Sequence, residues 1–197
     1  FLKMKALIIS DMHGENPIDF IQEKRKEGIE KLVALGDYDV PEILERILNL
    51  DMKKIVLLGN HDYGFVNGEE IWSPLLEDDP EVYVRYWSKP SQARNFALES
   101  YKIGEIRAGK KKGLKVVEKL DGKRIAYIHG ALVDCYSTRP LIWGRLIENM
   151  GVDQSRVKAN FNKMKKSGYD ILFRGHDHFS GVFGISKENH SNMALEE

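Results

Sequence analysis

The stretch Lys54-Ile55-Val56-Leu57-Leu58-Gly59-Asn60-His61-Asp62 decides the fold. After the lysine it is aliphatic and rich in β-branched residues, a composition typical of a strand buried on both faces of a sheet. Gly59 ends this run, and three residues follow whose side chains can hold a metal ion or a proton. Because open α/β sheets bind ligands beyond the carboxyl ends of their strands, the stretch predicts a functional site at such an edge.

Two earlier stretches are organised in the same way. Residues 5–10 and 31–35 are each predicted to form a strand, and each is followed within two residues by an aspartate. Helices are expected from Pro17 to about residue 28 and from Pro41 onward, because proline is favoured in the first helical turn. The order strand, helix, strand, helix, strand predicts a parallel sheet with crossover helices.

The second half of the chain contains further strands that end in polar residues. Residues 114–120 and 124–128 flank Asp121-Gly122, a dipeptide typical of a tight hairpin, and the second strand leads into His129. Strands are also expected at 169–173 and 182–185 and helices at 141–150 and 155–166, whereas residues 188–197 show no regular pattern. Asp177, between two histidines, is interpreted as a turn former, with support of the neighbouring ligands as the alternative.

Length and composition predict a single domain over residues 1–197, with 42% hydrophobic residues. Residues 63–113, which combine frequent aromatics with prolines, are predicted to be an insertion that sets substrate specificity. Basic and acidic residues both number 30, which argues against a dedicated nucleic-acid or membrane-surface binder. A single cysteine and the lack of an apolar run of about 20 residues favour a cytoplasmic location.

The placement of histidine carries the functional prediction, because five of the six histidines directly follow a predicted strand. Any one of them alone would be interpreted as a cap or turn residue, but their concentration at strand ends indicates a metal site. The polar residues at these ends are Asp11, His13, Asp37, Asn60, His61, His129, His176 and His178. Carboxylates, imidazoles and an amide suit Mn²⁺, Fe, Zn²⁺ or Co²⁺ rather than Ca²⁺ or Cu⁺, and there are enough ligands for two ions.

This set resembles the scattered signature of the calcineurin-like metallophosphoesterases. The matching motifs, in order, are Asp11-Met12-His13, Gly36-Asp37, Gly59-Asn60-His61-Asp62, His129-Gly130 and Gly175-His176-Asp177-His178. The resemblance implies an α/β fold, a four-layer α/β/β/α sandwich with mixed central sheets. It also implies a dinuclear metal-dependent enzyme that hydrolyses phosphate mono- or diesters by attack of a metal-bridging hydroxide. Mn²⁺ is the first expectation for the metal, with Fe, Zn²⁺, Co²⁺ or Ni²⁺ as alternatives.

The resemblance also implies a role for each site residue. Asp11, His13 and His178 would bind one ion, Asn60, His129 and His176 the other, and Asp37 would bridge them. His61 would face the substrate and protonate the leaving oxygen, and Asp62 would orient its ring. Asn60 and His61 are also candidate phosphate contacts, together with Arg94, Arg139 and Arg145.

The sequence leaves the substrate open among phosphorylated small molecules, nucleotides and phosphoproteins. Tyr38-Asp39-Val40-Pro41 stands where Ser/Thr protein phosphatases carry a phosphate-gripping arginine, whereas residues 141–145 faintly resemble those enzymes. A Ser/Thr-protein-phosphatase-like enzyme and a dinucleoside-polyphosphate hydrolase are therefore alternatives. A non-catalytic scaffold with this fold is the alternative from a different class, and zero net charge weighs against a DNA nuclease.

Overall fold

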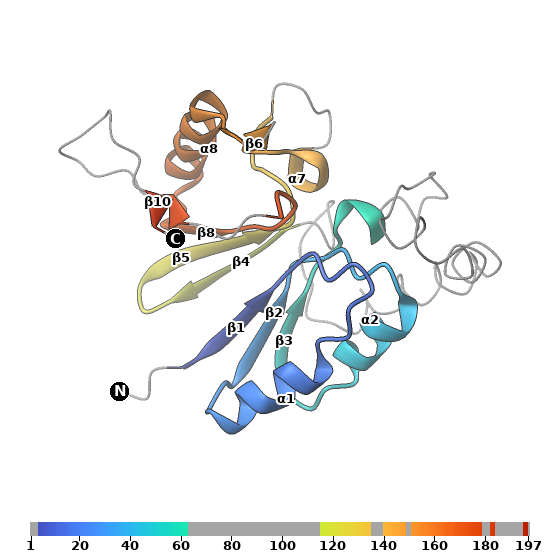
Figure 1. Ribbon diagram of the computed structural model, residues 1–197. Coiled ribbons are helices and arrows are strands. Elements are labelled where there is room, and N and C mark those ends of the chain that lie inside the picture. The colour runs from blue at the N-terminus through green and yellow to red at the C-terminus, as the bar shows by residue number, and fades with distance from the viewer. Residues whose placement is uncertain are drawn as a thin grey trace, which may run out of the picture.

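The first sheet of the protein is parallel throughout, as the strand and helix order predicts. The computed structural model describes residues 4–62, 115–134, 140–148, 151–178, 182–183 and 195–196. Strands β1 (Ala6–Ile9), β2 (Lys31–Ala34) and β3 (Lys53–Val56) lie in the order β1-β2-β3 (Figure 1). Every residue of the central strand β2 is buried, as expected of a strand covered on both faces.

Two amphipathic helices cover the outer face of this sheet. Helix α1 (Ile18–Lys26) follows Pro17, and helix α2 (Pro41–Leu48) has Pro41 in its first turn, so both begin where the prolines predict. Ile21 of α1 and Ile47 of α2 are fully buried and share a core cluster with Leu32 of the central strand. This cluster fixes the first helical layer against the sheet.

The second sheet is mixed. Strands β4 (Lys115–Leu120) and β5 (Lys123–Ile128) pair as an antiparallel hairpin, and β8 (Ile171–Phe173) runs parallel to β5. Asp121 and Gly122 have φ angles of 49° and 79°, the positive values that a type I′ hairpin turn requires. The predicted hairpin is thereby confirmed.

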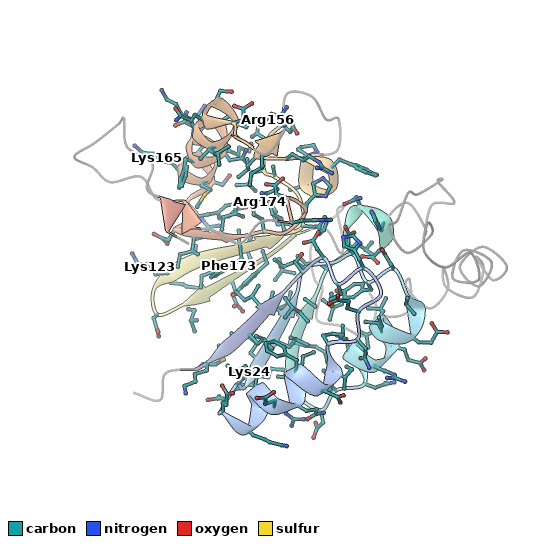
Figure 2. All side chains as sticks on the ribbon, viewed as in Figure 1. Lys24, Lys123, Arg156, Lys165, Phe173 and Arg174 are labelled. Atoms are coloured by element: carbon teal, nitrogen blue, oxygen red, sulfur yellow. The ribbon has the colours of Figure 1, made fainter. Side chains whose placement is uncertain are left out.

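The two sheets pack face to face and complete a four-layer α/β/β/α sandwich. Val33, Leu35, Ile55 and Leu57 meet Ile125 and Tyr127 in one cluster between the sheets. Phe173 of β8 packs against this cluster (Figure 2). Helix α8 (Gln154–Ser167) covers the far face, where Phe161 and Met164 pack against Ile128 and Leu172. Asp153 caps this helix by accepting hydrogen bonds from Ser155 N and Arg156 N. Of the two central sheets, only the second is mixed among the described residues.

The helix expected at residues 141–150 is wrong beyond its first turn. Helix α7 spans Pro140–Trp143, and β6 (Ile147–Glu148) and β7 (Gly151–Val152) form an antiparallel pair instead. A Cβ atom at Gly144 would lie only 2.6 Å from Pro140 O and 2.7 Å from Ala131 Cβ. Beyond it, Asp134 accepts a hydrogen bond from Arg145 N and Asp177 from Leu146 N. These tertiary contacts override the helical propensity of the segment.

The last strands are short. β9 (Val182–Phe183) lies within the strand expected at 182–185 and pairs with β10 (Leu195–Glu196), so the expectation of no regular structure over 188–197 is wrong at its end. The predicted insertion at 63–113 lies outside the described residues. None of the helices in the described ranges has the length and apolar character needed to cross a bilayer.

Candidate metal centre

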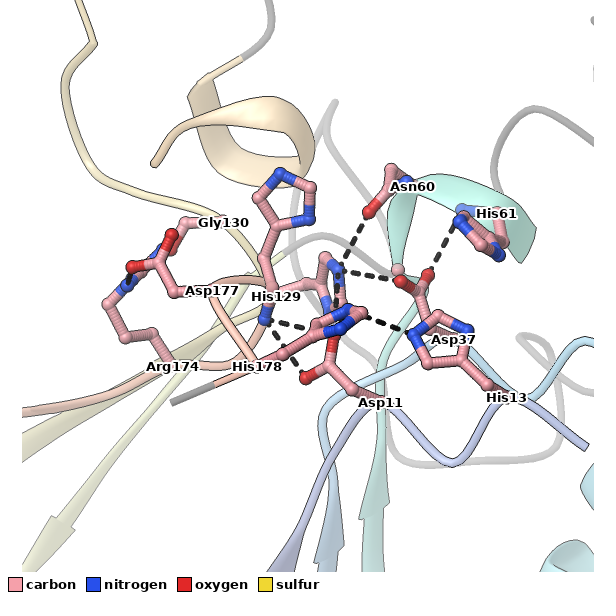
Figure 3. A network of polar contacts seen from close by, with 12 residues as sticks. Asp11, His13, Asp37, Asn60, His61, His129, Gly130, Arg174, Asp177 and His178 are labelled. Carbon is pink, nitrogen blue, oxygen red and sulfur yellow. Dashed lines mark hydrogen bonds and ion pairs between the residues drawn. The ribbon is translucent and has the colours of Figure 1, made fainter. Parts of the chain in front are cut away.

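The loops that follow the strands meet at one edge of the sandwich (Figure 3). Within the first sheet, Asp11 N donates to Gly36 O and His13 N to Asp37 O, both at 3.0 Å. His176 N, in the loop after β8, donates to both carboxylate oxygens of Asp11 at 2.9 and 3.1 Å. This last pair of contacts joins the strand ends of the two sheets, as the shared-edge prediction requires.

Two glycines permit the close approach of these loops. A Cβ atom at Gly59 would lie 1.9 Å from Asp37 Oδ1. A Cβ atom at Gly175 would lie 1.9 Å from Ser10 Oγ and 2.5 Å from Asp11 Oδ2. Any side chain at either position would therefore displace a carboxylate that the sequence predicts to be a metal ligand.

The first group of predicted ligands is Asp11, His13 and His178. One donor atom from each lies within 4.8 Å of the others. His178 Nε2 lies 2.9 Å from His13 Nε2 and 3.5 Å from Asp11 Oδ1. His13 donates its other ring nitrogen, Nδ1, to a carboxylate oxygen of Asp39 at 2.9 Å, the arrangement that commonly orients metal-binding histidines.

The second group of predicted ligands is more deeply buried. Asp37, His129 and His176 also offer donor atoms within 4.8 Å of one another, and all three residues are buried. His129 Nε2 lies 3.2 Å from Asp37 Oδ2 and 2.9 Å from Asn60 Oδ1. Asp37 is also grouped with His13 and His61, so its carboxylate lies between the two sets of ligands.

The backbone of this edge is strained. Seven described residues other than glycine have positive φ angles, and six of them are Asp11, His13, Asp37, Asp39, His176 and His178. Such conformations cost about 1–3 kcal/mol each and persist where surrounding contacts impose them, often at functional sites. Five of these six residues are predicted ligands, so most of the strain lies at the predicted metal centre.

His61 is oriented by Asp39 rather than by the expected Asp62. Asp39 Oδ1 accepts a hydrogen bond from His61 Nδ1 at 2.7 Å, while Oδ2 holds His13. The carboxylate of Asp62 accepts from Gly59 N, Asp37 N and Tyr38 N, at 2.9, 2.7 and 3.1 Å. Asp62 follows His61 directly, but its side chain turns back onto the backbone of the β2 and β3 loops. The only sequence signal for Asp39 was a second aspartate two residues after Asp37.

The charges of the site shift several pKa values. Burial lowers the pKa of His61, but the hydrogen bond to Asp39 and the charge of Asp37 outweigh it, so the pKa is raised. Burial and the charge of Asp37 raise the pKa of Asp62 to about 7, against its backbone N–H donors. His61 is thus favoured in its protonated form, which suits the acid role expected of it.

His176 provides a test of whether the residues fit a metal. Within the described ranges, its buried Nε2 has no hydrogen-bond partner. Burial, followed by the charges of His129 and Arg145, lowers the pKa of His176 to about 2. A neutral imidazole with an unpaired buried nitrogen is the form that binds a metal ion. The mixed carboxylate and imidazole donors at this edge therefore fit divalent transition metals.

Of the three candidate arginines, Arg145 lies within the described residues. Arg94 and Arg139 lie outside the described residues. Arg145 is exposed in the loop after α7, and its charge contributes to the lowered pKa values of His176 and His178, which places it beside the centre. Asp177 is more than a turn former, because it pairs with Arg174, a residue to which the sequence assigned no role.

Comparison with known proteins gives one family match and structural neighbours with a similar fold. A family profile described as the calcineurin-like phosphoesterase superfamily domain matches residues 4–192. None of the curated proteins matches the chain. Among solved structures, a hypothetical protein from Pyrococcus horikoshii OT3 is 16% identical with a TM-score of 0.56, over 98% of this chain and 75% of its own. A metallophosphoesterase from Sphaerobacter thermophilus is 20% identical with a TM-score of 0.54, over 98% of this chain and 68% of its own. The chain therefore belongs to the calcineurin-like phosphoesterase superfamily.

Proposed function

We propose that this protein hydrolyses phosphate mono- or diesters with two divalent metal ions bound where the strand ends meet. The observation that carries the proposal is the pair of neighbouring ligand groups, Asp11, His13 and His178 on one side and Asp37, His129 and His176 on the other. Membership of a phosphoesterase superfamily supports a metal-dependent hydrolase in general. Two adjacent ions are the arrangement used for in-line displacement at phosphorus.

The proposed ligands divide as the two groups suggest. Asn60 would join His129 and His176 as a ligand, because its Oδ1 lies 2.9 Å from His129 Nε2, and Asp37 would serve both ions, because its carboxylate lies near both ligand groups. Divalent ions held there lower the pKa of water and stabilise negative charge on a phosphate. Mn²⁺ is the leading candidate, with Fe, Zn²⁺, Co²⁺ and Ni²⁺ as alternatives. Asn60 is neutral and so leaves the positive charge of the centre for the substrate.

The remaining residues position and protonate the substrate. His61 donates a proton to the leaving oxygen, and Asp39 holds its Nδ1 and favours the imidazolium. Asp62 secures the backbone that carries Asp37 by accepting its N–H. Arg145 and Asn60 contact the phosphate; Arg94 and Arg139 stay as predictions outside the described residues. The substrates that this proposal covers are phosphorylated small molecules, nucleotides and phosphoproteins.

One experiment separates this function from a non-catalytic scaffold. The purified chain is stripped of metal, reloaded with Mn²⁺, analysed for bound metal, and assayed on a generic monoester, a diester, a dinucleoside polyphosphate and a phosphopeptide. Two equivalents of metal and Mn²⁺-dependent hydrolysis of at least one substrate are expected. Metal binding without hydrolysis of any of them would favour the scaffold, and the ranking of the four rates would assign the substrate class.

A further inference from the structure

Arg174 joins three segments that are far apart in the sequence. Figure 3 shows it beside Gly130 and Asp177. Its Nε donates to Gly130 O at 2.7 Å, and its Nη2 donates to Gly144 O at 3.0 Å. Its Nη1 pairs with the carboxylate of Asp177. One planar guanidinium thus holds the loop after β5, the loop after α7 and the loop after β8 in a single fixed geometry.

Asp177 extends this connection. Its two carboxylate oxygens accept from Leu146 N at 3.1 and 3.3 Å. The side chains of Arg174 and Asp177 are only 13% and 3% exposed, so this is a nearly buried ion pair. Pairs of this kind contribute little net stability compared with apolar residues of similar size, because both charges must be desolvated. Net stability alone therefore does not explain its presence.

The contacts of the pair lie beside predicted ligands. Gly130 directly follows His129, and Asp177 stands between His176 and His178. Three of the four predicted histidine ligands, His129, His176 and His178, are therefore next in sequence to a residue of this pair or to a residue that it contacts. Oriented imidazoles depend on such supporting contacts, and losing one typically weakens metal binding by about 10–100-fold.

The same pair holds the segment that carries Arg145. Gly144 O accepts a hydrogen bond from Arg174, and Leu146 N donates one to Asp177. The residues on both sides of Arg145 are therefore hydrogen-bonded to the loop after β8. Arg145 N is held separately by Asp134 Oδ2 at 3.1 Å. The backbone beneath this exposed arginine is consequently fixed relative to His176 and His178.

We propose that Arg174 and Asp177 are positioning residues. They fix the predicted metal-binding histidines and the backbone of residues 144–146, which carries Arg145, in one relative position. The part that concerns Arg145 rests on the proposed function, because it treats Arg145 as a phosphate contact. The part that concerns the histidines requires only metal binding. The pair thus links the positions of the predicted metal ligands to the position of Arg145, the proposed phosphate contact.

Calorimetric titration of the metal-stripped chain with Mn²⁺ tests the metal part. Arg174→Lys keeps the positive charge but loses the planar guanidinium that makes three contacts at once. Asp177→Asn keeps the shape of the side chain but removes its charge. Each is expected to weaken Mn²⁺ binding by about 10–100-fold at a temperature where the variant is fully folded. The matched control is Lys31→Met, which removes the Lys31–Glu118 ion pair between the sheets, with Lys31 only 8% exposed. This control is expected to lower the melting temperature without changing Mn²⁺ affinity.

A double variant separates positioning from stability. Arg174→Met with Asp177→Leu removes both charges, so no unpaired charge stays buried and part of the stability lost in the single variants is expected to recover. Gly130 O, Gly144 O and Leu146 N lose their side-chain partners in this variant. Mn²⁺ affinity is expected to stay low, because the loops are no longer held. Wild-type affinity in the double variant, or in both single variants, would reduce the pair to an ordinary structural contact and overturn the proposal.

Steady-state kinetics at saturating Mn²⁺ test the substrate part. Arg174→Lys is expected to raise KM for the best ester by more than it lowers kcat, because the Arg145 segment shifts. An unchanged KM would overturn this part. If the wild-type chain bound Mn²⁺ but hydrolysed no ester, the proposed function would fail while the calorimetric comparison would still decide the metal part.

Discussion

The interior between the two sheets and the edge where the strands end differ completely, although the same strands build both. Between the sheets the buried side chains include Val33, Leu35, Ile55, Leu57, Ile125 and Tyr127. A few residues farther along the same strands they are Asp37, Asn60, His61, Asp62 and His129. The interior gains stability from burying apolar surface, whereas burying carboxylates and imidazoles costs free energy.

This difference separates stability from function within one small sandwich. The interior is apolar apart from the Lys31–Glu118 ion pair, while the edge combines positive φ angles with a buried nitrogen, His176 Nε2, that lacks a hydrogen-bond partner among the described residues. Substitutions between the sheets should therefore change the free energy of unfolding and leave the chemistry intact. Substitutions at the edge should do the reverse, and the following predictions are ordered from the largest expected effect to the smallest.

Asp37→Asn is expected to have the largest effect, because Asp37 is shared between the two ligand groups. Turnover should fall by more than about 10⁴-fold, because loss of metal removes more than the general acid, which is itself worth about 10²–10⁴-fold. Bound metal should fall with it, as measured by elemental analysis. Asparagine can still accept from His61 N, so the fold should persist in circular dichroism. Wild-type metal content in this variant would exclude Asp37 as a bridging ligand.

His61→Ala should separate chemistry from metal binding. Loss of the acid should reduce turnover by about 10²–10⁴-fold. Both ions should stay bound, because His61 is not one of the proposed ligands. Metal content and single-turnover rates measured on the same preparation check this. Wild-type turnover on several substrates would show that His61 does not protonate the leaving group.

Leu57→Ala is the corresponding change between the sheets, where Leu57 is fully buried. Urea denaturation should show a loss of about 2–5 kcal/mol in the free energy of unfolding. Turnover per folded molecule should stay at the wild-type value. Ile171→Ala is the control, because Ile171 on β8 is 38% exposed and its truncation should cost much less. A loss of metal in Leu57→Ala would mean that the two regions are not independent.

Asp39→Asn should have an intermediate effect at the edge. The amide can accept from only one of the two imidazoles that Asp39 now holds, so turnover should fall by about 10–100-fold. The pKa of His61, which the carboxylate raises, should also fall because burial is then less opposed. Since the protonated ring acts as the acid, the alkaline limb of the pH–kcat profile should move to lower pH. An unmoved limb would place the titration on another group.

Glu118→Gln should produce the smallest effect, on stability alone. Burial raises the pKa of Glu118, but hydrogen bonds from Lys31 and Tyr127 outweigh it and hold the pKa below the ordinary value of 4.5. A lowered pKa in the folded state stabilises the fold above that value, and the contribution is lost as pH falls through the folded pKa. The variant should therefore lose about 1 kcal/mol of stability above pH 4.5 and show a flatter acid limb in urea denaturation. An acid limb as steep as that of the wild type would assign the transition to other carboxylates.

Much of the fold followed from local patterns. Each strand of the first sheet is predicted by an apolar run that is followed by glycine or aspartate. Asp121-Gly122 predicts the hairpin, and the φ angles of these two residues confirm it. The helix at 141–150 failed because Gly144 packs against Ala131 and because Asp134 and Asp177 bind the backbone beyond it. Those partners are 11 to 31 residues from the groups they bind, beyond the reach of any local pattern.

The sequence by itself determined that polar residues at Asp11, His13, Asp37, Asn60, His129, His176 and His178 would share one edge. Parallel strands place their carboxyl ends together, which accounts for Asp11, Asp37 and Asn60 in the first sheet. The packing of the second sheet against the first brings the histidines that follow β5 and β8 to the same edge. Only the tertiary structure decided that Asp39 rather than Asp62 orients His61, and that Arg174 pairs with Asp177 across three loops. Side-chain partners depend on the directions in which loops turn after the strands, and packing sets those directions.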